Sequence, residues 1–266
     1  MPQAFPKKAS QCGRLFYFGL WLLCLGPTAL AGSQCPPSHI DVKTSVSYVY
    51  DGDTVRLHSG DKVRLIGINT PEMARDKRPA EPLASEARQA LITLLARHEQ
   101  QISLRYGQQQ RDRYGRLLAH AYTPQGESIS AHLLDAGLAS LIAIPPNLTG
   151  LDCYARVEQR ARHQQRGLWA QPGIRDSANL SRHARGFTIV RGRVVRIGES
   201  RHNLWLNMAG GLALRIAKKD LRWFEQESPR ALAGRHVIAR GWIYARKGKQ
   251  RMQVHHPYAL EVIDNE

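Results

Sequence analysis

Three short stretches in the first half of the sequence combine acids and arginines in an order that suits phosphodiester chemistry. DGDT carries Asp53, VRLIGINTPE carries Arg64 and Glu72, and DRYGRLLAH carries Arg116. A guanidinium group matches the oxygens of a phosphate in pairs, and a carboxylate beside a metal ion orients or deprotonates a water molecule. These residue types therefore predict hydrolysis of a phosphodiester bond.

The same stretches supply oxygen ligands for a metal ion. Asp53 offers a carboxylate, and Asn69 and Thr70 offer neutral oxygens. Oxygen ligands of this kind suit a hard cation such as Ca²⁺. Each stretch alone has a purely structural interpretation, because Asp-Gly is a common hairpin turn and Tyr-Gly-Arg reads as a turn before a strand. The ordered set, rather than any one stretch, carries the prediction.

Short strands must position these residues. The alternation from Val46 to Tyr50, a second alternating run over 54–57 and a third run over 63–68, which Pro71 ends, all read as strands. Three strands within about thirty residues predict a small barrel or meander. Beyond them the pattern predicts helices over 83–97, 130–137 and 152–165, strands over 102–106 and 117–122, and a polar loop over 108–115.

A change in composition separates a second β-rich region. Residues 171–186 are rich in Pro, Gly, Ser and Arg and read as a linker. Between 187 and 263, about five strands predict a second small barrel that resembles an OB-type nucleic-acid-binding module in outline. The expected strands are 187–197, 203–207, 212–217, 236–244 and 252–262, with a short helix over 219–226.

This second region carries arginines and aromatics that suit nucleic-acid binding. The candidate side chains are Arg191, Arg193, Arg196, Trp205, Trp242 and Tyr244. Aromatic rings beside cations stack on bases, although aromatic residues also fill protein cores. We therefore hypothesise that the second barrel is an accessory domain that holds the substrate.

The chain as a whole is strongly basic. Its 266 residues have a net charge of +16 and an isoelectric point of about 10.2. This balance favours a polyanionic partner, either nucleic acid or an anionic membrane surface. A membrane-surface protein is disfavoured because the sequence lacks a basic amphipathic helix of the expected kind.

The first 31 residues read as a secretory signal peptide. A basic start, an apolar run over 15–25 and an Ala-Leu-Ala cleavage signal predict export to a periplasm or the medium, with 32–41 as a leader. The alternative is an inner-membrane anchor formed by residues 15–31, although the run is short for a spanning helix. Two cysteines remain after cleavage, Cys35 and Cys153, and an oxidising compartment favours a disulfide between them over two independent thiols.

The ordered motifs resemble the staphylococcal-type thermonuclease family. D-G-D-T, R-L-x-G-x-x-T-P-E, D-x-Y-G-R and the helical LLDAGLA follow one another between residues 42 and 169. The resemblance implies an OB barrel with packed helices over 42–170. Together with the second barrel, this gives a mainly β fold with some α structure (α+β).

The resemblance also implies roles for individual residues. Glu72 matches the general base or water-orienting carboxylate of the family, and Arg64 and Arg116 match its two phosphate-binding arginines. Arg113 and Tyr114 match positions that flank the bound nucleotide. All five residues are present in the sequence.

The expected metal site departs from the family pattern at one position. Asp53 matches a Ca²⁺ ligand, and Thr70 matches the residue that holds the metal through its backbone carbonyl. Asn69 stands where the family commonly has aspartate, so Ca²⁺ should bind more weakly, and Mg²⁺ or another divalent ion is an alternative. The stretch 141–147 also lacks the tyrosines that stack on a base in the best-known members.

Two functions from different classes follow. The first is an exported, Ca²⁺-dependent endonuclease that hydrolyses DNA and RNA with little sequence specificity through metal-assisted attack of water. The second is a catalytically silent barrel that binds nucleic acid. Glu72, Arg64, Arg116 and Asp53 favour the enzyme, and Asn69 favours the silent barrel. We expect a monomer without a stable protein partner, and a membrane contact only if the signal peptide is not cleaved.

Overall fold

The computed structural model describes Met1, Gln3 and residues 35–75, 78–170, 173–226 and 228–263. The chain divides into two units, Met1–Gly32 and Ser33–Glu266, and the helices and strands of the described residues belong to the second unit. The expected signal peptide and the alternative anchor over 15–31 lie outside the described residues, apart from Met1 and Gln3. Within the described part of the chain, none of the helices has the length and apolar character needed to span a membrane.

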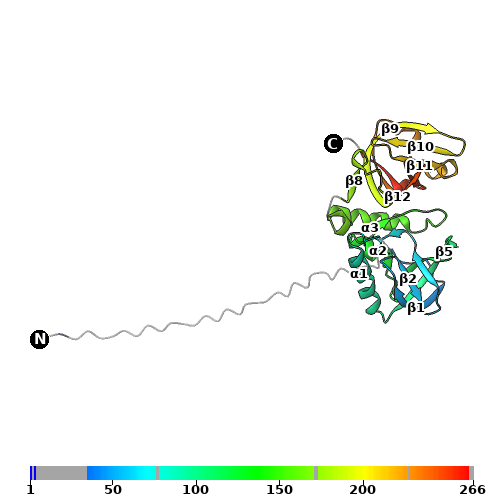
Figure 1. The fold of residues 1–266 in the computed structure, drawn as a ribbon. Coiled ribbons are helices and arrows are strands. Elements are labelled where there is room, and N and C mark those ends of the chain that lie inside the picture. The colour runs from blue at the N-terminus through cyan, green and yellow to red at the C-terminus, as the bar shows by residue number, and fades with distance from the viewer. Residues whose placement is uncertain (2, 4–34, 76–77, 171–172, 227, 264–266) are drawn as a thin grey trace. The chain divides into compact units, whose positions relative to one another are not determined.

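Five strands close the first barrel in the order β1-β2-β3-β6-β5 (Figure 1). β3 and β6 run parallel, and the other neighbouring pairs are antiparallel. Inward-facing apolar residues such as Val55, Val63 and Leu104 are fully or almost fully buried and form the core. The strands are β1 Val42–Val49, β2 Thr54–Leu57, β3 Lys62–Leu65, β5 Gln101–Arg111 and β6 Leu117–Tyr122.

Three helices and a two-stranded ribbon complete this barrel. The elements are α1 Ala84–Ala96, α2 Ile129–Asp135, α3 Leu151–His163, β4 Ile68–Asn69 and β7 Ser140–Leu141. α1 buries Ala84, Ala87, Leu91 and Leu95, which recur at the spacing of one helical face. α2 begins at Ser128, whose hydroxyl accepts a hydrogen bond from the Ala131 N–H. The helices predicted from sequence thus form within one or two residues of the expected bounds.

A disulfide joins the start of the described chain to α3. Cys35 and Cys153 are bonded and lie 118 residues apart in sequence. The predicted pairing of the two mature cysteines is therefore confirmed. It fixes the segment before β1 against the helix that also carries Tyr154 and Glu158.

The prediction of one strand over 63–68 is wrong. β3 ends at Leu65, the chain turns at Ile66 and Gly67, and β4 begins at Ile68. Gly67 has a φ of +85°, and a Cβ atom there would lie 2.7 Å from the ring of Tyr154. A glycine tolerates both the positive φ and the close contact, which lets the chain turn sharply before Asn69 and Thr70, the predicted metal ligands.

Three other elements differ from the sequence expectation. β5 continues to Arg111, through the first half of the predicted loop, because Asn147 accepts from the Gln109 N–H at 2.9 Å and donates to its carbonyl at 3.0 Å. The expected strand over 252–262 is interrupted by a 3₁₀ turn, Pro257–Ala259. The short helix expected over 219–226 is a 3₁₀ helix, Lys218–Trp223.

The second barrel also closes through five strands. They follow the order β9-β10-β11-β13-β12, and β12 pairs back to β9. β8 extends the sheet beside β9, and β14 extends it beside β12. The strands are β8 Ile174–Asp176, β9 Gly186–Glu199, β10 Asn203–Met208, β11 Ala213–Ala217, β12 His236–Arg246, β13 Lys249–Val254 and β14 Leu260–Ile263. The predicted mainly β fold with two small barrels is confirmed, and β8 lies within the segment that the sequence suggested as a linker.

Candidate active site

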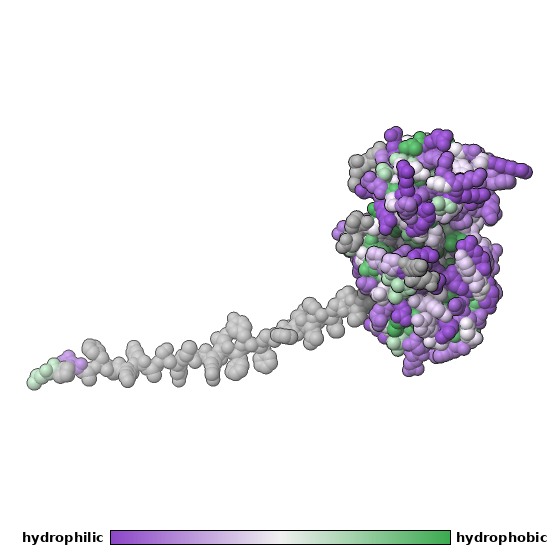
Figure 2. All heavy atoms as spheres, in the orientation of Figure 1, coloured by the Kyte–Doolittle hydropathy of each residue, from purple (hydrophilic) through white to green (hydrophobic). Residues whose placement is uncertain are grey.

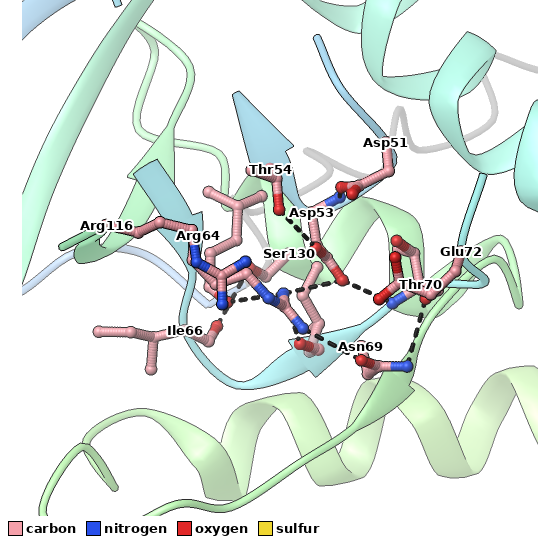
Figure 3. Close-up of polar contacts among 12 residues, drawn as sticks. Asp51, Asp53, Thr54, Arg64, Ile66, Asn69, Thr70, Glu72, Arg116 and Ser130 are labelled. Carbon is pink, nitrogen blue, oxygen red and sulfur yellow. Dashed lines mark hydrogen bonds and ion pairs between the residues drawn. The ribbon is translucent and has the colours of Figure 1, made fainter. Parts of the chain in front are cut away.

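Four of the predicted site residues form one hydrogen-bonded network (Figure 3). Arg64 forms an ion pair with Asp53 at 2.8 Å through Nη1 and donates to Asn69 Oδ1 at 3.1 Å through Nη2. Asp53 Oδ2 also accepts from the Thr70 N–H at 2.7 Å. All four side chains are buried. The network therefore joins β3, β4 and the turn before β2 into one rigid site.

Strand pairing explains why these residues meet. β2 and β3 pair with Thr54 opposite Arg64, so the neighbouring Asp53 lies beside the guanidinium group. The Leu65 N–H donates to the Asp53 carbonyl at 2.8 Å, which continues the pairing by one residue. Arg64 further donates to the Ile68 carbonyl at 3.0 Å. The turn at Gly67 thus brings β4 back over the arginine.

Asn69 is held in a specific orientation. Its Oδ1 accepts from Arg64, and its Nδ2 donates to the Thr70 carbonyl at 3.2 Å. The opposite orientation of the amide would direct its NH₂ group at the guanidinium, and two donors would then face each other. Asn69 therefore links Arg64, which is expected to bind phosphate, to the carbonyl that is expected to hold a metal.

Asp51 and Glu72 add negative charge next to this network. Asp51 accepts from the Asp53 N–H at 3.0 Å, and burial, followed by the charge of Asp53, raises its pKa to about 7. Burial also raises the pKa of Glu72; Asp53 adds to the rise, and Arg64 opposes it. The Glu72 N–H donates to Glu81 Oε2 at 3.1 Å. Three carboxyl groups, those of Asp51, Asp53 and Glu72, thus lie near the guanidinium group of Arg64.

This donor set fits an oxygen-coordinated divalent cation. Asp53 offers a carboxylate and Thr70 a carbonyl, and a bound cation would favour the charged forms of Asp51 and Glu72, whose pKa values are raised first by burial and then by the charge of Asp53. The Thr70 hydroxyl is buried without a hydrogen-bond partner among the described residues. These residues contain no group of three or more His, Cys, Asp or Glu side chains placed to hold a metal. A cation would therefore rely on neutral oxygens as well as carboxylates.

Arg116 belongs to a second group of predicted residues, at the turn between β5 and β6. It forms an ion pair with Asp112 at 2.8 Å, and the same carboxylate accepts from the N–H groups of Tyr114 and Arg116. Arg113 donates to the Tyr114 hydroxyl at 2.7 Å, and its guanidinium lies 4.8 Å from the ring centroid. The guanidinium of Arg116 lies 5.6 Å from the same centroid.

Tyr114 is exposed, with 68% of its surface accessible, so an aromatic ring with arginines beside it faces solvent. This arrangement suits a base and its neighbouring phosphate. The structure thus unites Arg113, Tyr114 and Arg116 in one exposed group, and Asp53, Arg64, Asn69 and Thr70 in another, buried group. Among the described residues, the ion-pair partner of Arg116 is Asp112 rather than a member of the buried network.

An aromatic and cationic strip on β1, β2 and β3 was not singled out by the sequence analysis. Tyr48 pairs with Arg56, and Arg56 pairs with Lys62. The Tyr48 and Tyr50 rings meet edge to face at 4.9 Å, and Lys62 lies 4.8 Å from the Tyr50 centroid. The signal was present, because Tyr48, Arg56 and Lys62 each stand next to a valine that is buried, on β1, β2 and β3 respectively.

Asp51 was also missed as a member of the site. In the sequence, the first acid of DGDT reads as part of a hairpin turn. Its burial and its hydrogen bond to the Asp53 backbone place it beside the expected metal ligand. Asp51 and Asp53 flank Gly52, and this pair of acids is the feature of the sequence that indicates a shared site.

Comparison with known proteins agrees with these motifs. A family model described as "Staphylococcal nuclease homologue" matches residues 62–171. The chain is 30% identical over 127 residues to a thermonuclease of Staphylococcus hyicus, covering 46% of this chain and 72% of that protein. It is 29% identical over 163 residues to a micrococcal nuclease of Shigella flexneri, covering 57% of this chain and 87% of that protein.

Other relatives are longer than the matched region. The chain is 31% identical over 136 residues to the SPbeta prophage-derived endonuclease YokF of Bacillus subtilis (strain 168), which is 50% of this chain and 45% of that protein. For endonuclease YncB of the same organism, the match covers 64% of the relative. The chain thus spans less than two thirds of these two endonucleases. The barrel, the ordered motifs and the match to most of the length of the staphylococcal enzyme together show that the chain belongs to the staphylococcal nuclease family.

Proposed function

We propose that this protein is an exported, metal-assisted nuclease that hydrolyses DNA and RNA with little sequence specificity. The observation that carries the proposal is the buried contact of Arg64 with Asp53 and Asn69, next to a Glu72 carboxyl whose pKa is raised. The names of the relatives, thermonuclease and endonuclease, support the same activity. The strongly basic composition supports a polyanionic substrate.

In the proposed mechanism, Glu72 orients a water molecule and accepts one of its protons. The water oxygen bonds to phosphorus as the bond from phosphorus to the 5′-oxygen breaks, and the leaving oxygen takes a proton from solvent. This leaves a 3′-phosphate end. A general base of this kind typically contributes about 10²–10⁴ in rate. The raised pKa of Glu72 suits it to hold a transferred proton.

Arginines stabilise the charge that develops on phosphate. Arg64 is fixed by Asp53 and by the Ile68 carbonyl, so its guanidinium needs little reorganisation as the reaction proceeds. Arg116 is oriented by Asp112 and lies beside Tyr114, where a nucleotide would stack. We assign Arg113 and Tyr114 to substrate binding and Arg64 and Arg116 to the phosphate.

Asp53 and Thr70 would hold the metal ion, with Asn69 next to them. A bound divalent cation would supply positive charge to the phosphate oxygens and to the attacking water. Ca²⁺ is the first choice on the family resemblance, and Mg²⁺ is the second because Asn69 lacks a negative charge.

Export is supported by the disulfide between Cys35 and Cys153, because stable disulfides are characteristic of oxidising compartments. The mature chain would then act in a periplasm or in the medium. The assignment of residues 1–31 to a signal peptide, 42–170 to the nuclease domain and 187–263 to an OB-like domain is part of this proposal.

A catalytically silent, nucleic-acid-binding barrel is the second candidate. Asn69 favours it, since its oxygen already accepts from Arg64 and its NH₂ group occupies the Thr70 carbonyl. Binding of a cation by both Asn69 and Thr70 would require this contact to open. The two candidates differ in whether divalent ions produce cleavage.

The deciding experiment uses the chain from Gly32 to Glu266 with its disulfide formed. Cleavage of single-stranded DNA and of RNA is followed with Ca²⁺, with Mg²⁺ and with a chelator. We expect metal-dependent cutting that falls by about a hundredfold or more in Glu72→Gln. Glu86→Gln, which changes an exposed acid on α1, should match the parent. Salt-sensitive binding without cutting in any divalent ion would instead identify a silent barrel.

A further inference from the structure

The outer side of β10, β11 and β13 forms a polar face on the second barrel. Inward residues such as Leu204, Leu206 and Leu214 are fully buried, and the residues between them face outward. The strand register places Trp205 opposite Arg215, and Ala213 beside Arg251. Hydrophilic side chains dominate the visible surface of this barrel (Figure 2).

Two neighbouring pockets lie on this face. The larger, of about 550 Å³, is lined by Trp205 together with Arg182, Lys249 and Arg251. The smaller, of about 300 Å³, is lined by four cationic residues, Arg201, Arg215, Lys218 and Lys219. Seven lysines and arginines therefore line the two pockets, and no aspartate or glutamate does so among the described residues.

The two pockets meet at strand residues that are already paired. Trp205 lines the larger pocket and Arg215 the smaller one, and these two residues lie opposite each other on β10 and β11. A single extended chain that passed from one pocket to the other would cross this pair. A row of cations on both sides of an aromatic ring matches the alternation of phosphate and base along a single strand.

Trp205 is held in a position suited to stacking. Its Nε1–H donates to the Ser200 hydroxyl at 3.2 Å, which fixes the ring plane. The guanidinium of Arg251 lies 4.8 Å from the ring centroid. Both an indole ring and a guanidinium plane stack on bases, so this pair provides a platform without sequence preference.

The topology places the pockets at a preferred binding surface of such barrels. In the order β9-β10-β11-β13-β12, β10 and β11 are the second and third strands in sequence, and Gly248 lies in the turn between the fourth and fifth. OB-type barrels bind oligonucleotides or oligosaccharides at this face and its flanking loops. The excess of cations and the lack of acids favour the phosphate-bearing ligand.

We propose that this face is a second binding site for single-stranded nucleic acid, with Trp205 and Arg251 stacking on a base and Lys249, Arg182 and Arg215 contacting phosphates. Its role in holding substrate for cleavage rests on the nuclease function proposed above. Of the candidate side chains named from the sequence, only Trp205 lines the pockets. The others, Arg191, Arg193, Arg196, Trp242 and Tyr244, lie on β9 and β12.

The test measures binding of labelled single-stranded oligothymidylate to the chain from Gly32 to Glu266 in the presence of a chelator, which prevents cutting. We expect Trp205→Leu to weaken binding by about fivefold to a hundredfold, the effect of losing one stacked base. Replacing Lys249 and Arg251 by Gln should reduce the slope of log affinity against log salt by about 0.7, for the one phosphate contact of Lys249, and should weaken binding further because the stacking of Arg251 is lost.

Arg222→Gln is the matched control. Arg222 also lies over a tryptophan of this barrel, 4.9 Å from the centroid of Trp223, but it lines neither pocket. It should bind oligothymidylate as the parent does. Cleavage of a dinucleotide with metal, a substrate too short to reach both barrels, should be the same in the parent and in all these variants.

The outcomes separate this proposal from the nuclease proposal. If Trp205→Leu and the Lys249 and Arg251 variant bind oligothymidylate as tightly as the parent, the second site is refuted, whether or not the chain cuts. Competition by a neutral oligosaccharide, with parent-like oligothymidylate binding in the variants, would assign the face to carbohydrate and refute it too. If binding falls as expected but no metal produces cleavage, the nuclease proposal fails and the binding site stands.

Discussion

Arg240, on β12 of the second barrel, donates to both carboxylate oxygens of Glu158 on α3, at 2.8 and 2.7 Å. Both side chains are only 5% exposed. Glu158 also accepts from the Leu141 N–H at 2.7 Å, and β7, which contains Leu141, pairs with β4 so that Ser140 lies opposite Asn69. One buried carboxylate thus connects the second barrel to the ribbon that carries a residue of the candidate active site.

Replacing Arg240 by Met should destabilise the chain strongly. It would leave Glu158 buried with its remaining partner Arg162, and removal of one partner from a buried pair typically costs about 3–5 kcal/mol. Unfolding by urea, followed by circular dichroism, measures the change. We also expect the two barrels of the variant to unfold at separate midpoints, because their shared buried contact is lost.

Arg162→Met is the matched control for this prediction. Arg162 also pairs with Glu158, at 3.1 Å, but its side chain is 22% exposed, so its loss should cost less. The double variant of Arg240→Met with Glu158→Gln should recover part of the loss, because the unpaired charge is then removed. An Arg240→Met chain that unfolds in one transition at the parent's midpoint would show that the contact does not couple the barrels.

Asn69→Asp should increase the affinity for Ca²⁺. The change adds a carboxylate between Arg64 and the Thr70 carbonyl and removes the amide donor that occupies that carbonyl. Calcium affinity rises with the number of charged ligands, so we expect a gain of about tenfold or more. Calorimetric titration with Ca²⁺ measures it independently of cleavage.

Asn179→Asp provides the control, since it adds the same charge at an exposed position on the 3₁₀ helix Ser177–Asn179. It should leave Ca²⁺ binding unchanged. Equal binding of Ca²⁺ by Asn69→Asp and the parent would mean that residue 69 does not contribute to the metal site, and that the arrangement around Thr70 has another purpose.

The sequence indicated which candidate residues would lie together better than it predicted their contacts. The motifs identified Asp53, Arg64, Asn69 and Thr70, and the structure places these four in one network. The turn at Gly67 was not predicted, because a run of apolar residues looks continuous until the position of Tyr154, far along the chain, is known. Only that contact shows why the strand must break.

The contact between the barrels also could not be predicted from the sequence, because it joins residues that are far apart in the chain. Glu158 reads from the sequence as a polar position on a helix, and Arg240 as one of many arginines in a basic chain. Their pairing joins residues 82 positions apart. A local pattern shows which face of an element is apolar, whereas the partner of a buried charge depends on tertiary packing. Asp51 was missed for the same reason, since its burial depends on elements beyond the DGDT turn.

His120 should make the folded state sensitive to acid. It is 3% exposed on β6, its Nδ1 lies 3.1 Å from the Tyr154 hydroxyl, and burial, with a smaller effect of Arg105, lowers its pKa to about 4. The unfolded chain, in which the pKa is about 6.5, binds a proton in this range while the folded chain does not. The free energy of unfolding should therefore fall by about 3 kcal/mol as the pH drops from about 6.5 to about 4.

His120→Gln isolates this effect because glutamine does not titrate. Asp51, whose pKa is raised to about 7, acts in the opposite direction over the same range, so the comparison must be between variant and parent at each pH. We expect the difference in unfolding free energy between parent and His120→Gln to shrink as the pH falls towards 4. A difference that is constant with pH would show that His120 binds protons equally in the folded and unfolded chains.

Tyr48 should contribute to the binding of single-stranded substrate beside the active site. Its ring is 46% exposed, and the guanidinium groups of Arg56 and Arg88 lie 5.7 and 5.8 Å from its centroid. The ring shares the outer side of the sheet with Arg64, because the outward positions of paired strands lie on one face. The stretch 141–147 lacks tyrosines for base stacking, and Tyr48 offers an exposed ring on the same side of the sheet as Arg64, in addition to Tyr114.

Tyr48→Ala should therefore raise KM for single-stranded DNA by about fivefold or more, the effect of losing one stacked base, while kcat stays near the parent value. Trp242→Leu is a suitable control, because Trp242 is 41% exposed but lies on β12 and, among the described residues, has no cation over its ring. Steady-state cleavage with saturating metal measures both constants. A fall in kcat with unchanged KM would contradict a binding role, because it would show that Tyr48 acts on the reacting phosphate rather than on the strand that leads to it.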